Sequence, residues 1–170
     1  MKKNIRLLSD FNLEIYYNFL NQKINSKKYK LNKPNFGLFY DQCFELIKSK
    51  NKNYIVLVWS QVERVLKNFH KLILNEKINL KSLYKEVDEY INILKQLAKK
   101  TNYLIINSWS LPVNERGKYL NDLTDDLGLS KNINLINLKM ADELKKEKNI
   151  IYLNIDFWIR NYNSNYNPKF

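Results

Sequence analysis

The chain has 170 residues, a formal net charge of +12, 45% hydrophobic residues and 14% aromatic residues. This apolar content excludes an intrinsically disordered chain, and three Gly and three Pro are too few for a turn-rich β-sandwich. The lone Cys43 excludes an internal disulfide and a thiolate zinc site, and no apolar run reaches transmembrane length. We therefore expect one soluble, cytoplasmic domain over residues 1–170, with no metal or other cofactor.

The first part of the chain reads as strand, helix, strand, helix. Residues 5–8, apolar except for Arg6, predict a short buried strand, and apolar or aromatic residues then recur at helical spacing from Leu13 to Leu20. Residues 29–31 alternate in polarity and predict a weak edge strand before Pro34. The next helix is expected to bury one face, formed by Phe39, Cys43, Phe44, Leu46 and Ile47.

The clearest strand is residues 54–59, a continuous apolar and β-branched run of the kind found in sheets that helices cover on both faces. Helical periodicity follows in residues 62–74 and more strongly in residues 80–98. The remaining expected elements are a strand at 103–106, a long polar loop, a helix at 132–146 and a last strand at 150–155. This alternation implies parallel pairing and right-handed crossovers. The predicted fold is α/β, a three-layer α/β/α sandwich around a mostly parallel five-stranded sheet.

Small polar residues follow four of these strands, at the edge of a parallel sheet where ligands bind. They are Ser9, Asp10 and Asn12; Trp59, Ser60 and Gln61; Asn107, Ser108 and Trp109; and Asp156. Their convergence predicts a substrate site at this rim. An alternative is that Asp10 or Asn12 only caps the first helix and that the two tryptophans are packed in the core. Cys43 and His70 are expected to be core and surface residues, respectively.

The excess of basic residues has two interpretations. Lys and Arg total 29, which suggests a polyanionic partner, but only four of them are Arg. Asn, Ile, Lys and Tyr, which AT-rich codons encode, are abundant throughout, so genome composition can raise the Lys content without a binding face. The excess is concentrated in residues 1–53, which carry a net charge of +7. We expect a solvated basic surface, and nucleic-acid binding remains an alternative.

Several of these segments resemble the N-terminal domain of FkbH-like proteins. The resemblance rests on residues 7–12, 58–63 and 106–112, extended by residues 136–141 and 166–170. It implies an SGNH-hydrolase-like, flavodoxin-like fold. In full-length relatives this domain precedes a catalytic domain of the haloacid-dehalogenase (HAD) type that handles acyl or glyceryl groups. No Asp-x-Asp-x-Thr phosphatase motif occurs here, so the chain is expected to be either a truncated N-terminal domain or a stand-alone protein.

The ester-hydrolysing motifs of the wider SGNH superfamily are eroded in this sequence. The superfamily's nucleophile position falls on Phe11, and its Asp-x-x-His block falls on residues 156–159, without the histidine. Ser9 is a candidate displaced nucleophile, and Asp10 and Asp156 are the acids that could serve it. Gln61 would be an amide donor to an oxyanion.

The resemblance implies a domain that binds an acyl, glyceryl or sugar-linked group for transfer in polysaccharide or secondary-metabolite synthesis. Asn12, Trp59, Ser60, Gln61, Asn107, Ser108 and Trp109 are the expected substrate-binding residues. The expected partners are an acyl carrier protein or a HAD-type phosphatase domain, with no membrane. The alternatives are a divergent SGNH esterase or O-acyltransferase that uses Ser9 or Ser60, and a basic nucleic-acid-binding protein.

Overall fold

A computed structural model describes residues 2–34, 38–49, 53–111, 123–124 and 128–155. The strands are β1 (Lys3–Ser9), β2 (Tyr29–Leu31), β3 (Tyr54–Trp59), β4 (Tyr103–Asn107) and β5 (Ile150–Leu153). The helices are α1 (Glu14–Lys23), α2 (Phe39–Lys48), α3 (Val62–Val65), α4 (Lys67–Ile73), α5 (Leu80–Ala98) and α6 (Leu129–Leu144). None of these helices is long and apolar enough to cross a membrane.

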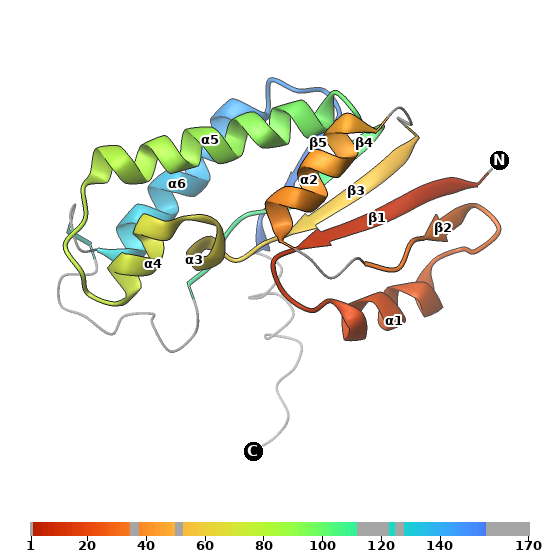
Figure 1. The fold of residues 1–170 in the computed structure, drawn as a ribbon, viewed down its shortest axis with the longest axis horizontal. Helices are drawn as coiled ribbons and strands as arrows, with labels where there is room; N and C mark the ends of the chain where they lie inside the picture. Colours follow the sequence, from red (N-terminus) through yellow and green to blue (C-terminus); the bar gives the residue numbers. More distant parts are fainter. Residues whose placement is uncertain (1, 35–37, 50–52, 112–122, 125–127, 156–170) are drawn as a thin grey trace, which may run out of the picture.

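The five strands form one sheet in the order β2-β1-β3-β4-β5, and all four pairings are parallel. Helix α1 lies on one side of the sheet, while α2, α5 and α6 lie on the other (Figure 1). The predicted three-layer α/β sandwich is therefore confirmed. The strand order reverses direction between β1 and β3, which is the topological switch point of a flavodoxin-like sheet.

The two sides of the sheet carry two cores of unequal size. The larger core packs alternate residues of the central strands, among them Leu8, Val56 and Ile106, against α2, α4, α5 and α6. The smaller core joins Leu7 and Leu31 to residues at and around α1. Strands with apolar residues on both faces need helices packed against both faces. Here most of the buried apolar residues belong to the larger core.

Two helical predictions need correction. Phe44 was expected to face the core, but 43% of its surface is exposed. Around the axis of α2, its side chain points about 100° or more away from the buried side chains of Phe39, Cys43 and Leu46. The predicted continuous helix over residues 62–74 is divided into α3 and α4 at Leu66, whose backbone is extended. Helix α4 starts there because Glu86 of α5 accepts hydrogen bonds from the backbone and the side chain of Asn68, at 3.0 and 2.8 Å.

Candidate functional site

The ends of β1, β3 and β4 lie next to one another at one edge of the sheet. Ser9 is paired in register with Trp59, and β4 continues on the other side of β3 as far as Asn107. The loops that begin at Asp10, Ser60 and Ser108 therefore leave the same rim. Nine of the ten predicted site residues lie at or just after these three strand ends, and the tenth, Asp156, lies outside the described residues.

Asp10 connects the first two of these loops. Its Oδ2 accepts a hydrogen bond of 2.9 Å from the backbone N–H of Gln61, and its backbone carbonyl accepts one of 2.9 Å from Arg64. Its Oδ1 is buried and accepts no hydrogen bond from a described residue. Burial raises the pKa of the Asp10 carboxyl, and the backbone N–H groups of Gln61 and of Asp10 itself oppose that rise. The carboxylate thus keeps one acceptor oxygen for which the described residues provide no donor.

Ser9 and Asn12 organise the start of α1. The Ser9 Oγ accepts a hydrogen bond of 3.1 Å from the N–H of Phe11, and the Asn12 Oδ1 accepts one of 2.8 Å from the N–H of Glu14. The second of these satisfies a backbone donor at the helix start, as a capping residue does. Asn12 thus bonds to the first helical N–H from the position before the N-cap residue Leu13, whereas the Asp10 side chain bonds to another loop.

Asn107 provides a second unpartnered acceptor at the end of β4. Its side-chain amide donates a hydrogen bond of 2.8 Å to the Ser108 carbonyl, while its Oδ1 is buried and unpaired among the described residues. Ser108 is also buried, and its Oγ accepts a hydrogen bond of 2.9 Å from the N–H of Ile155. Asn107 ends β4 and Asp10 follows β1, the two strands that flank β3, so their backbones are about 10 Å apart, two strand spacings.

Ser60 and Trp109 belong to the core rather than to an open pocket wall. The Trp109 indole donates a hydrogen bond of 3.1 Å to the Ser60 Oγ, which also bonds to the Tyr90 hydroxyl at 3.0 Å. Only 2% of Trp109 and 3% of Ser60 is exposed, and the rings of Trp109 and Tyr90 lie 5.0 Å apart. Trp59 is half-buried, and its ring meets Tyr16 edge-on at 4.9 Å.

Sequence reasoning assigned no role to Asn137, which holds the loop after β4 in place. Its side chain accepts from the Trp109 N–H at 2.9 Å and donates to the Trp109 carbonyl at 2.7 Å. The Tyr152 hydroxyl donates to the same Oδ1 at 3.0 Å. The available signal was an asparagine next to the inward-facing Ile136, in a helix where a polar residue close to the core needs partners.

A cavity of about 220 Å³ opens beside the β1 exit. Residues on its wall include Ser9, Phe11, Asn12, Tyr17 and Lys33. Its mixed apolar and polar wall suits a small ligand with a few hydrogen-bonding groups. The cavity lies on the β2 side of the rim, whereas Gln61 and Asn107 lie on the β3 side.

The described residues do not assemble a serine–histidine pair. The single histidine of the chain, His70, is exposed on α4, and its ring bonds to no serine or carboxylate in the described ranges. No group of three His, Cys, Asp or Glu residues suited to a metal ion occurs in those ranges either. Cys43 is fully buried, and burial raises the pKa of its thiol to about 12, as expected of a core residue.

No protein-family model matches the sequence, and no curated protein matches it. Among solved structures, the fold is similar to the crystal structure of the N-terminal part of the protein BF1531 from Bacteroides fragilis, which contains a phosphatase domain complexed with Mg. The TM-score is 0.65 at 13% identity, over 97% of this chain and 43% of that one. This likeness establishes a shared fold. The chain spans less than half of the solved chain that it matches.

Proposed function

We propose that this chain is a substrate-binding domain of the FkbH-like kind. In this role it holds a glyceryl, acyl or sugar-linked group at the rim, for transfer in polysaccharide or secondary-metabolite synthesis. The similarity to part of a phosphatase-domain protein supports a HAD-type phosphatase domain as the partner. A carrier protein that presents the group as a thioester is the second expected partner.

The observation that carries the proposal is the pair of buried, unpartnered oxygens, Asp10 Oδ1 and Asn107 Oδ1. Buried acceptors without donors are rare, because each one costs the free energy of its lost hydration. Here they follow the strands on either side of β3, next to the switch point at which sheets of this order bind ligands. A ligand with hydroxyl or amide donors would satisfy both oxygens, and a glyceryl or sugar group carries such hydroxyls.

The proposal assigns ligand contacts to fewer residues than the sequence analysis did. Asp10 and Asn107 would accept the ligand's hydroxyl hydrogens, and the Gln61 side chain, beside Asp10, would bond to a carbonyl oxygen. Trp59 would be the apolar contact. Ser60, Ser108 and Trp109 would support the loops from within, since their polar side-chain atoms already have protein partners.

The test measures binding of two probes by saturation-transfer NMR: the glyceryl and the acetyl thioesters of N-acetylcysteamine. We expect the glyceryl probe to bind more tightly, and Asp10→Ala and Asn107→Ala each to weaken it about tenfold, the effect of one lost hydrogen bond to a buried acceptor. The matched control is Asp41→Asn on the exposed side of α2, which should leave binding unchanged. Equal affinity in all three folded variants would refute the proposed site.

A further inference from the structure

A second cavity lies between β1, the residues after β2, and α2. It has a volume of about 130 Å³, and its wall includes Arg6 and Leu7, Asn32 and Lys33, and Gln42 and Glu45. Only Lys33 also lines the cavity beside Ser9 and Asn12. Because none of these six residues belongs to the proposed substrate site, the second cavity raises a separate question of what it binds.

Arg6 places a positive charge on the wall of this cavity, and no carboxylate among the described residues neutralises it. Its side chain is half-buried, its guanidinium carbon lies 4.7 Å from the centre of the Tyr54 ring, and its Nε is buried without a hydrogen-bond partner. No described carboxylate pairs with it. A partly buried cation without a counter-charge is costly, so an anion bound beside it would be stabilised. Arginine Nε and Nη groups are suited to bind two oxygens of one oxyanion.

The backbone of β1 adds a donor to the same cavity. The Ile5 carbonyl accepts a hydrogen bond of 2.9 Å from the Asn32 N–H, so the odd-numbered residues of β1 direct their backbone groups toward β2. The pairing with β2 ends at Ile5 and Leu31. Beyond that point β2 provides no partner for the N–H of Leu7, which lines the cavity. An edge N–H of this kind can donate to a bound anion.

The surrounding charge also favours an anion. Lys33 is the second cation on the cavity wall, and Glu45 is the one acid among the residues that line it. Residues 1–53, which include the whole wall, carry a net charge of +7. A local excess of this sign raises the concentration of small anions near the opening.

We propose that this cavity binds the phosphate group of a small ligand. Arg6 and Lys33 neutralise its charge, the Leu7 N–H and the Asn32 side chain donate hydrogen bonds, and Glu45 limits the affinity by repulsion. The volume suits one phosphate group with a water molecule, given about 30 Å³ for each water. The donors come from β1 and from the segment after β2, and α2 closes the remaining side of the cavity.

The experiment is a ¹H–¹⁵N NMR titration of the full chain with inorganic phosphate and, separately, with glycerol 3-phosphate, at constant ionic strength set with chloride. We expect saturable shifts that map to Arg6, Leu7, Asn32 and Lys33. Tighter binding of the monoester would identify a phosphorylated metabolite as the ligand, and equal binding would identify free phosphate. Both results support the phosphate site, whereas shifts that do not saturate, or that map elsewhere, overturn it.

Four charge variants make the test specific. We expect Arg6→Gln to weaken binding more than tenfold, the exposed Lys33→Gln to weaken it about fivefold, and Glu45→Gln to tighten it about threefold. Lys48→Gln removes a charge from the exposed end of α2, at a residue that does not line the cavity, and should change affinity less than about twofold. Equal losses in Lys33→Gln and Lys48→Gln would show general screening and contradict the proposal. Lys33→Gln keeps the test valid if Arg6→Gln does not fold.

Discussion

At the scale of single residues, the polar side-chain atoms at the rim differ in whether the protein provides them with hydrogen-bond partners. The Ser60 Oγ has two partners, the Trp109 indole and the Tyr90 hydroxyl, and the Ser9 Oγ accepts from the N–H of Phe11. Asp10 and Asn107 each retain one buried oxygen without a donor among the described residues. A satisfied buried group stabilises the fold, whereas an unsatisfied one leaves room for a ligand's donor.

This difference predicts that Ser60→Ala lowers stability and leaves ligand binding intact. The substitution removes the acceptor of the Trp109 N–H and the partner of the Tyr90 hydroxyl, both buried, so the free energy of unfolding should fall by about 1–3 kcal/mol. Urea unfolding followed by tryptophan fluorescence measures the change, and the exposed Ser82→Ala is the matched control. Unchanged stability together with lost binding of the glyceryl probe would instead make Ser60 a ligand contact.

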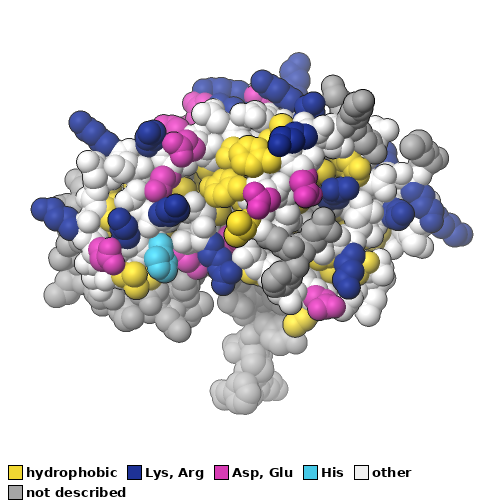
Figure 2. All heavy atoms as spheres, in the orientation of Figure 1, with side chains coloured by type: hydrophobic (Ala, Val, Ile, Leu, Met, Phe, Trp, Pro, Cys, Tyr) yellow, Lys and Arg dark blue, Asp and Glu magenta, His cyan; other side chains and the backbone are white. Residues whose placement is uncertain are grey.

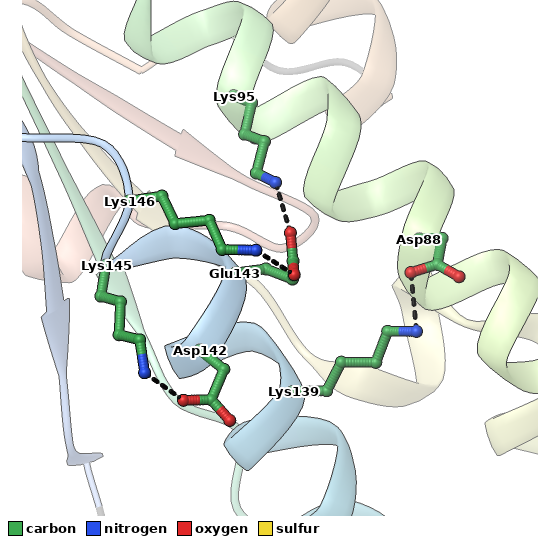
Figure 3. A network of polar contacts seen from close by, with 7 residues as sticks. All are labelled: Asp88, Lys95, Lys139, Asp142, Glu143, Lys145 and Lys146. Carbon is green, nitrogen blue, oxygen red and sulfur yellow. Dashed lines mark hydrogen bonds and ion pairs between the residues drawn. The ribbon is translucent and has the colours of Figure 1, made fainter.

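At the scale of secondary-structure elements, ion pairs join α5 to α6 across the surface of the larger layer. Lys95–Glu143 and Lys139–Asp88 cross between the two helices, and Lys146–Glu143 and Lys145–Asp142 join α6 to the lysines just after its end (Figure 3). Glu143 bonds to Lys146, just after α6, and to Lys95 of α5, and these hydrogen bonds lower the pKa of its carboxyl to about 2. Over the visible face, basic and acidic side chains are interleaved rather than gathered into one basic stripe (Figure 2).

The pH dependence of stability tests the Glu143 pairs. Because the pKa of Glu143 is lowered on folding, its contribution is fully present above the unfolded value near 4.5 and is lost as the pH falls toward 2. Glu143→Gln should therefore unfold at a slightly lower temperature than the wild type at pH 6, and the two melting temperatures should converge near pH 2. Circular dichroism melts measure both. Asp142→Asn, which loses one exposed pair with Lys145 just after α6, is the control.

At the scale of the whole molecule, the two faces of the sheet are covered unequally. Leu7, Leu57, Ile105 and Ile151 form one row across four strands, and the α1 side covers the Leu7 end of it. Ile151, at the far end of the row, is 43% exposed. Residues on the opposite face, such as Ile106, are fully buried beneath the larger helical layer. The layer opposite α1 therefore contributes most of the hydrophobic stabilisation.

A matched pair of substitutions measures this asymmetry. Ile106→Ala should lower the free energy of unfolding by about 2–5 kcal/mol, because it leaves a cavity in the larger core. Ile151→Ala removes the same atoms from a half-exposed position and should cost less than about 1 kcal/mol. Urea unfolding of both variants gives the comparison, and similar losses would mean that the Ile151 face is covered in solution.

Local patterns in the sequence were sufficient for the five strands, the long helix α5 and the polar rim, because apolar runs and helical periods are properties of neighbouring residues. They also placed Ser9, Asp10 and Asn107 at strand ends. They did not reveal the break at Leu66 or the exposure of Phe44, and they left open whether Trp109 is buried. Those outcomes depend on partners distant in the chain, Glu86 for the start of α4 and Tyr90 for Trp109. Which polar oxygens remain free for a ligand was decided by tertiary structure alone, since a donor such as the Gln61 N–H reaches Asp10 only after β1 and β3 have paired.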